Sequence, residues 1–180
     1  MDSHSTGKPD EALEGPTQSS GTVGRIMALD LGDRRIGIAV TDPLGYTVQP
    51  LMTLYRKAPR ADLKSIARLI RKHGVVEVVV GKPLHISGEQ SPRAQKAEAF
   101  AAELQAETGI PVHLWDERLT SWEANQLLDS VGHSNSRTAV GRQQRKQVID
   151  QAAAVLILES FMQTREIERT RQSPPERPAE

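Results

Sequence analysis

The sequence predicts an α/β domain built on a mixed five-stranded sheet, with helices on both faces. Three strand-like segments come first, and the short turns between them are typical of antiparallel neighbours. Strand-like and helix-like segments then alternate. The run VVEVVVG at 75–81 is β-branched and apolar on both faces, as in a buried parallel strand. The first three strands are therefore expected to pair antiparallel and the later ones parallel.

Each element is bounded by its own local pattern. The first three strands are expected at 25–31, 35–41 and about 46–54, with GD and DPLG turns between them. A helix is expected over 60–73, where Leu63, Ile66 and Ile70 recur at helical spacing and Gly74 follows. The remaining predicted elements are a strand at 75–81, a helix at 92–108, a strand at 112–117, a helix at about 120–130 that begins with the capping-box pattern TSWE, and a helix at about 144–163.

The two ends of the chain are predicted to be disordered tails around one domain at 25–164. Residues 1–24 have few large apolar side chains, and residues 165–180 alternate charge with proline. Such segments bury too little apolar surface to offset the entropy of ordering. No segment has the apolar length of a signal peptide or a membrane span, and the chain has no cysteine. We therefore expect a cytoplasmic protein without a membrane partner.

The net charge, taken by region, is compatible with a nucleic-acid partner. The formal charge of the 180 residues is 0. The N-terminal tail holds one lysine against four acids and the C-terminal tail is balanced, which leaves the domain itself at +3. Bound divalent cations would raise this value and give a surface that attracts phosphates. An ordinary neutral protein would have a similar composition, so charge alone does not decide.

Three acidic residues form the candidate catalytic centre. Asp30 ends the apolar run RIMALD, Glu117 ends VHLWDE, and Asp150 lies inside the apolar run QVIDQAAAVLILESF. An ionised carboxylate in an apolar element is costly unless a positive charge compensates it. The carboxyl ends of parallel strands meet at one edge of a sheet, and the alanines at 152–154 would let the last helix pack closely across that edge. Three carboxylates there predict a shared Mg²⁺ or Mn²⁺ site, and two such ions can align a water with a scissile phosphate.

Each acid also has an ordinary structural interpretation. Asp30 could cap the turn that follows it, Glu117 could pair with Arg118, and Asp150 could lie on an exposed helix face. A DxG sequence after a strand also occurs in actin-like ATPases, but those need two such lobes and about twice this length. The coincidence of three acids at the ends or middle of apolar elements favours the shared cation site.

The motifs that carry these acids resemble the YqgF/RuvX family of RNase H-like proteins. They are DLGDRRIGIAVTDPLG at 30–45, VVVGKPL at 78–84, DERLTS at 116–121 and KQVIDQAAAVLIL at 146–158. The resemblance implies an RNase H-like fold over nearly all of residues 25–163 and a metal-binding role for the three acids. It also implies processing of the 5′ end of precursor 16S ribosomal RNA and, in some members, resolution of Holliday junctions. One departure is Lys82, where the family commonly has leucine.

Basic residues near the three acids are the candidate nucleic-acid contacts. Residues 132–143 are predicted to form a mobile basic loop, because glycines and arginines gather there without any acid. An ordinary solvated loop and ordinary salt bridges are the alternatives. The predicted nucleic-acid-binding set is Arg34, Arg35, Lys82, Arg118, Arg137, Arg142, Arg145 and Lys146.

Three functions remain open from the sequence. The first is a metal-dependent nuclease that matures the 5′ end of precursor 16S ribosomal RNA and leaves a 5′-phosphate, with the small ribosomal subunit as a further partner. The second is a Holliday junction resolvase, which would act as a two-fold homodimer because it makes two symmetric cuts. The third is a non-catalytic RNA-binding factor in ribosome assembly or transcription. The resemblance favours RNA over DNA as the substrate.

Overall fold

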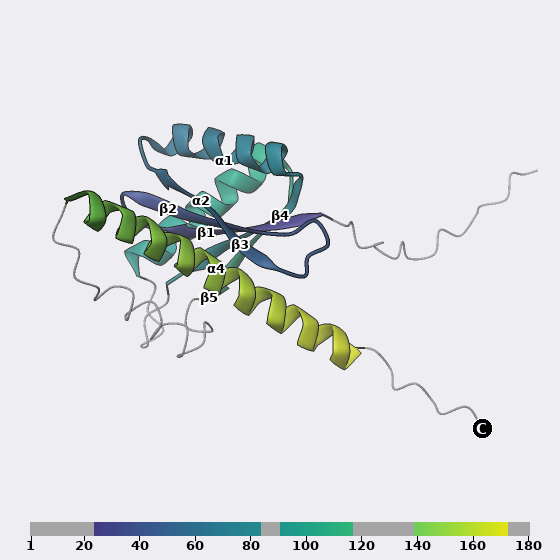
Figure 1. Cartoon of the computed structure of the whole chain (residues 1–180). Helices are drawn as coiled ribbons and strands as arrows, with labels where there is room; N and C mark the ends of the chain where they lie inside the picture. Colours follow the sequence, from purple (N-terminus) through teal and green to yellow (C-terminus); the bar gives the residue numbers. More distant parts are fainter. Residues whose placement is uncertain (1–23, 84–90, 117–138, 173–180) are drawn as a thin grey trace, which may run out of the picture.

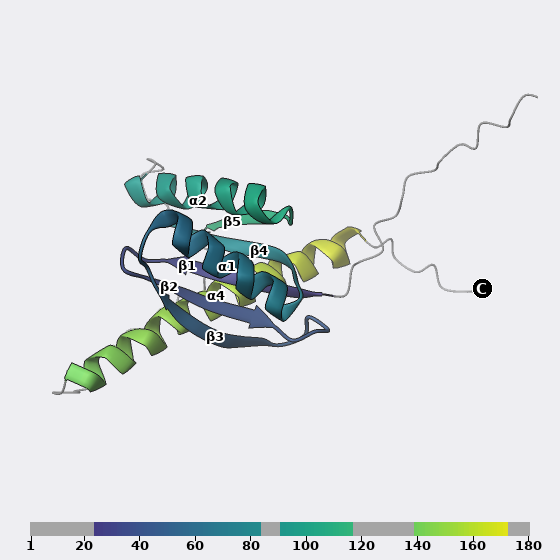
Figure 2. The ribbon, with the colours of Figure 1, turned by 90° about the horizontal axis from the view of Figure 1, so that it is seen from above.

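The computed structural model describes residues 24–83, 91–116 and 139–172, and it confirms the predicted mixed five-stranded sheet. The strands are β1 (Arg25–Leu31), β2 (Arg35–Thr41), β3 (Val48–Tyr55), β4 (Val75–Lys82) and β5 (Val112–Asp116). They lie in the order β3-β2-β1-β4-β5 (Figures 1 and 2).

The strand directions also agree with the prediction. β2 pairs antiparallel with β1 and with β3, whereas β4 pairs parallel with β1 and with β5. This order and these directions are those of the RNase H-like fold that the resemblance implies. The carboxyl ends of β1, β4 and β5 therefore share one edge of the sheet, and β2 begins at that same edge. Asp30 and Gly37 are directly opposite each other in the β1–β2 pair.

Helices cover both faces of the sheet. α1 (Pro59–His73) and α2 (Pro92–Thr108) lie on one face, and α4 (Ala139–Gln172) crosses the other (Figure 1). Successive residues of a strand point to opposite faces. Accordingly, Met27 and Leu29 join the core beneath α1 and α2, while Ile26 and Ala28 join the core beneath α4. The buried face of β1 on the α4 side is thus continuous with the helix that carries Asp150.

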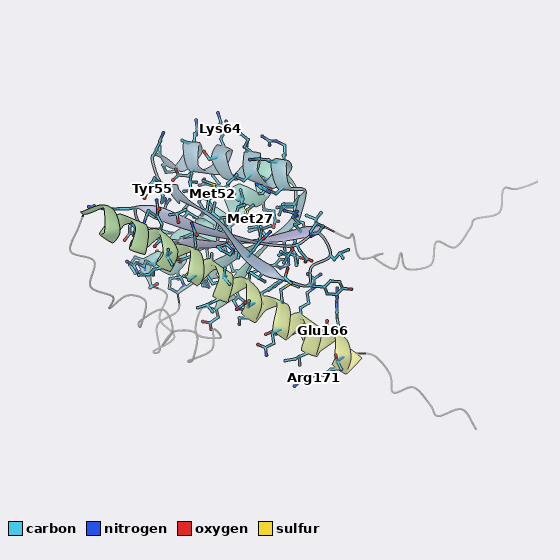
Figure 3. The ribbon with its side chains drawn as sticks, viewed as in Figure 1. Met27, Met52, Tyr55, Lys64, Glu166 and Arg171 are labelled. Atoms are coloured by element: carbon cyan, nitrogen blue, oxygen red, sulfur yellow. The ribbon has the colours of Figure 1, made fainter. Side chains whose placement is uncertain are left out.

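α4 is longer than predicted. The expected helix was 144–163, but the helix extends over 139–172, so 139–143 of the predicted loop and 165–172 of the predicted tail are helical. The prediction followed the apolar spacing, which stops at both ends of that run. Arg, Gln and Glu are good helix formers without apolar spacing, and Arg165 is tied to Glu77 of β4 by an ion pair of 2.5 Å. Glu166 and Arg171 project from the extended end (Figure 3).

The third strand begins later than predicted. It was expected from about residue 46 but begins at Val48, because the side chain of Asp42 accepts hydrogen bonds from the backbone N–H groups of Tyr46 (2.7 Å) and Thr47 (3.2 Å). Those bonds hold Tyr46 and Thr47 in the turn, so the strand begins only after them. The predicted helix at 120–130, residues 132–138 of the predicted loop, and tail residues 1–23 and 173–180 lie outside the described residues. No helix in the described part is long and apolar enough to cross a membrane.

Candidate active site

Asp30 lies at the carboxyl edge of the sheet, one residue before the end of β1. Its carboxyl group is largely shielded from water and lies close to the negative charge of Asp150. The shielding, and then that charge, raise the pKa of Asp30 from 3.8 to about 6, and the positive charge of Arg93 opposes the shift. A carboxylate with a raised pKa beside a second carboxylate marks a place where a cation would be stabilised.

Asp150 is brought to this edge by a close contact between α4 and β2. A Cβ atom added at Gly37 would lie 1.9 Å from the backbone oxygen of Asp150, far inside any real contact distance. Only glycine therefore allows the helix backbone to sit so close to the strand. Because Gly37 is opposite Asp30 in the sheet, the contact places the backbone of Asp150 next to Asp30.

The close approach of α4 was predicted, but from a different feature. The alanines at 152–154 were expected to allow it, and Ala154 is indeed fully buried against the sheet, while Ala152 and Ala153 are partly exposed. At Asp150 itself, however, the residue that allows the close approach is Gly37 of the strand and not an alanine of the helix. The sequence signal that could have identified it is a glycine inside the apolar strand RIGIAVT.

Arg35 forms an ion pair with Asp150, its Nε donating to Oδ2 of the carboxylate. Both side chains are mostly buried, with 24% and 20% of their surface exposed. Arg35 was predicted to contact phosphate; in this structure its guanidinium compensates the charge of the second acid. It is the first residue of β2, so it also lies at the carboxyl edge of β1.

Glu117, the third predicted acid, lies outside the described residues. The residue before it, Asp116, is the last of β5 and is paired in register with Lys82 at the carboxyl end of β4. Within the described ranges no three His, Cys, Asp or Glu side chains are grouped closely enough to hold a metal ion. The role of Glu117 therefore remains a prediction.

The two described acids nonetheless match the chemistry of a divalent cation. Carboxylate oxygens are the ligands that Mg²⁺ and Mn²⁺ prefer. The raised pKa of Asp30 has two causes, first the burial of its carboxyl group and then the nearby negative charge of Asp150. A cation held between the two acids would relieve that repulsion.

The remaining predicted nucleic-acid contacts are only partly described. Lys82 pairs with Glu98 of α2 at 2.5 Å, and Arg34 is exposed in the turn between β1 and β2. Arg118 and Arg137 lie outside the described residues. Arg142, Arg145 and Lys146 belong to the first turns of α4, but their side chains are outside the described part. Arg93 was not predicted, although it follows the helix-capping residue Ser91 by two positions and acts on Asp30 through its charge.

The far half of α4 is anchored at the opposite end of the sheet. Glu77 of β4 accepts from Arg165 (2.5 Å) and lies 2.8 Å from His113 of β5, at the ring nitrogen Nε2. Trp115 donates from Nε1 to the hydroxyl of Ser160 at 3.2 Å, and its ring packs edge-on against Phe161. These contacts tie the C-terminal half of α4 to β4 and β5, whereas the contact with Gly37 positions the helix at Asp150 itself.

Comparison with known proteins identifies a family. The family model RuvX, described as Holliday junction resolvase, matches residues 24–164. A protein of Koribacter versatilis named "Putative pre-16S rRNA nuclease" is 45% identical over 152 residues, covering 84% of this chain and 95% of that protein. A protein of the same name from Pelotomaculum thermopropionicum is 47% identical over 139 residues, covering 77% and 86% of the two chains. RuvC of Thermus thermophilus, solved with a Holliday junction substrate, aligns at 14% identity and a TM-score of 0.48, over 79% of this chain and 96% of that chain.

Proposed function

Because the chain belongs to the RuvX family, we propose that it is a metal-dependent nuclease whose catalytic residues are Asp30, Glu117 and Asp150. Hydrolysis of a phosphodiester bond is the activity shared by the resolvase and nuclease names of its relatives. The observation that carries the proposal is the approach of Asp150 to Asp30 through the missing Cβ of Gly37. That approach brings two acids together where charge repulsion would otherwise keep them apart.

The proposed substrate is the 5′ end of precursor 16S ribosomal RNA, and the small ribosomal subunit is the proposed partner. Support comes from relatives with 45% and 47% identity that carry the pre-16S rRNA nuclease name and are matched over most of their length. The chain has only six aromatic residues, two each of Trp, Tyr and Phe, so base stacking has few side chains to rely on. Recognition would then depend on backbone shape and charge.

We propose that the three acids hold two Mg²⁺ or Mn²⁺ ions. When bound, such ions stabilise the attacking and the leaving oxygen of an in-line displacement. Asp30 has to be ionised to serve as a ligand, so protons compete with the cation for this carboxylate increasingly below about pH 6. Arg35 holds the carboxylate of Asp150 in place before any substrate arrives, and it is within reach of the same edge as a contact for phosphate.

A second candidate is resolution of four-way DNA junctions, which the description of the family model favours. Two symmetric cuts need a two-fold dimer, so a chain that stays monomeric on DNA would count heavily against this candidate. A third candidate, a non-catalytic RNA-binding factor, gives no reason to bring Asp150 so close to Asp30.

The deciding experiment compares both substrates under the same conditions. End-labelled precursor 16S leader RNA and a four-way DNA junction are incubated with the full chain in Mn²⁺ or Mg²⁺. Asp30→Asn is the test variant, and Glu166→Gln, which removes an exposed carboxylate of α4 far from the site, is the matched control. Cleavage of RNA alone, lost in Asp30→Asn and kept in Glu166→Gln, supports the proposal. Paired cuts in the junction alone support the resolvase, and a folded Asp30→Asn protein with most of its activity would overturn both.

A further inference from the structure

We propose that a cleft beside the catalytic edge binds the phosphodiester backbone of the nucleic-acid strand on one side of the cleavage point. The cleft lies on the face of the sheet covered by α1 and α2. It is formed by the turn after β1, the segment that leads into α1, and the first half of α2, and it encloses about 670 Å³. The inference deepens the proposed function and rests on it for the kind of ligand.

The cleft is lined by an excess of positive charge. Five basic side chains border it, namely Arg34, Arg56, Lys57, Arg93 and Lys96, against three acids. Arg56 pairs with the buried Asp62 at 3.1 Å and donates to the backbone oxygen of Gly32 at 3.0 Å, so it belongs to the framework of the cleft. The other four cations are exposed.

The exposed cations are incompletely neutralised. Asp33 serves two of them, lying 3.3 Å from Arg93 and 3.5 Å from Lys96, each of which is 69% exposed. The two cations lower the pKa of Asp33, so this acid stays ionised and one carboxylate serves both of them. In the described part of the chain, Arg34 and Lys57 have no acidic partner within ion-pair distance. A phosphate entering the cleft would therefore meet cations that are available to bind it.

The backbone segments that carry Lys57 and Arg93 are fixed by the framework before a ligand binds. Asp62 accepts from the backbone N–H of Lys57 at 3.0 Å, which fixes the entry to α1. The hydroxyl of Ser91 accepts from the N–H of Ala94 at 3.0 Å and donates to the oxygen of Pro83 at 3.0 Å, which fixes the start of α2 and hence Arg93. Because the backbone at these positions is already ordered, a ligand that binds there does not have to order it.

The cleft borders the catalytic edge from the α1 and α2 side of the sheet, whereas Asp30 faces α4. Leu31, which lines it, directly follows Asp30 in β1. Arg93 pairs at 3.3 Å with Asp33, which lies in the turn directly after β1 and three residues from Asp30. Leu31, Ala99 and Phe100 supply an apolar surface among the cations, suited to the apolar side of a sugar. A chain of alternating sugars and phosphates matches this arrangement better than a single small anion does.

The test measures binding without cleavage, in the presence of EDTA. A fluorescein-labelled RNA duplex with a single-stranded 5′ extension is titrated with the full chain at several salt concentrations. The test variant is Lys57→Gln with Arg93→Gln. The control is Lys64→Gln with Arg68→Gln, which removes the same charges from the outer, exposed side of α1 (Figure 3 labels Lys64). Both double variants are compared with wild type by thermal unfolding, so that loss of fold is recognised.

We expect the test variant to bind more weakly and the control to bind like wild type. Each lost phosphate contact in a duplex makes the slope of log K against log salt shallower by about 0.9. If two contacts are lost, a fourfold rise in salt should weaken binding by the test variant about tenfold less than it weakens binding by the wild type. Wild-type binding and slope in a folded test variant would overturn the proposal, as would an equal loss in the control. A rise in Tm of the wild type, but not of the test variant, with inorganic phosphate alone would instead indicate a small-anion site. This experiment measures binding only, so a negative result would not bear on the proposed cleavage that depends on Asp30. Conversely, a protein that does not cleave could still show the predicted loss of binding.

Discussion

The contact between Gly37 and Asp150 makes a sharp prediction about the variant Gly37→Ala. The added Cβ would meet the backbone oxygen of Asp150 at 1.9 Å, whereas real Cβ contacts essentially never fall below 3.0 Å. Strand and helix must therefore separate by at least about 1 Å at the point where the two acids meet. Misplacement of catalytic groups by about 1 Å can lower the rate about a hundredfold, and overpacking costs about 1–3 kcal/mol of stability.

Gly109→Ala provides the matched control for that experiment. Gly109 ends α2 with φ of 71°, and an added Cβ there has no atom within 4 Å. A non-glycine residue in this left-handed conformation costs about 1–2 kcal/mol, a similar loss of stability without movement of α4. The assay is the cleavage rate on the better substrate, with thermal unfolding of each variant in parallel. We expect Gly109→Ala to keep its rate and Gly37→Ala to lose it. Equal rates in the two variants would refute the claim that this contact positions Asp150.

Three further predictions concern charged side chains, two at the site and one in the far half of α4. The pKa of Asp30 is raised from 3.8 to about 6 in the fold, so its ionisation destabilises the metal-free protein as pH rises through that range. Asp30→Asn should therefore raise the free energy of unfolding at pH 7 in EDTA by at most about 3 kcal/mol, which is measured as a higher Tm, and the gain should vanish towards pH 3.8. If the difference in Tm between Asp30→Asn and wild type does not depend on pH in this way, Asp30 is not buried beside Asp150 as the structure shows. Arg35→Gln leaves the carboxylate of Asp150 without its ion-pair partner, so the Tm in EDTA should fall by the equivalent of about 1–3 kcal/mol. Mn²⁺ should restore part of this loss, because a cation would compensate the same carboxylate. An equal loss of Tm in EDTA and in Mn²⁺ would contradict a cation site there. Arg165→Gln removes the ion pair to Glu77 and should lower stability by about 1 kcal/mol while leaving the cleavage rate unchanged, and a large loss of rate would show that the anchor matters beyond stability.

Much of the fold could be predicted from local patterns. The strands at 25–31 and 35–41 and the helix at 92–108 have the predicted bounds, because an apolar alternation or a proline and a glycine mark both ends. The ends of α4 could not be predicted in the same way. Polar helix formers continue the helix past its apolar run, and the contact that holds Arg165 comes from a strand about 90 residues earlier in the chain.

The candidate site could also be predicted only in part, because some of its residues follow from local patterns and others from contacts between distant segments. Asp30 and Asp150 stand out in the sequence because each is a carboxylate inside an apolar run, where an ionised group is costly unless a positive charge compensates it. The need for glycine at position 37 depends on the backbone of a distant helix, which no local pattern contains. The cleft likewise combines three separate segments, so Lys57, Arg93 and Lys96 have no common signal in the sequence.

The central claim is that three acids share divalent cations, and calorimetric titration of the full chain with Mn²⁺ tests it most directly. Asp30→Asn, Glu117→Gln and Asp150→Asn are compared with wild type and with Glu166→Gln, and each protein is assayed for cleavage in parallel. We expect all three site variants to bind Mn²⁺ more weakly and to lose cleavage, while Glu166→Gln matches wild type in both. A folded Glu117→Gln or Asp150→Asn protein with wild-type Mn²⁺ affinity and cleavage would contradict the claim.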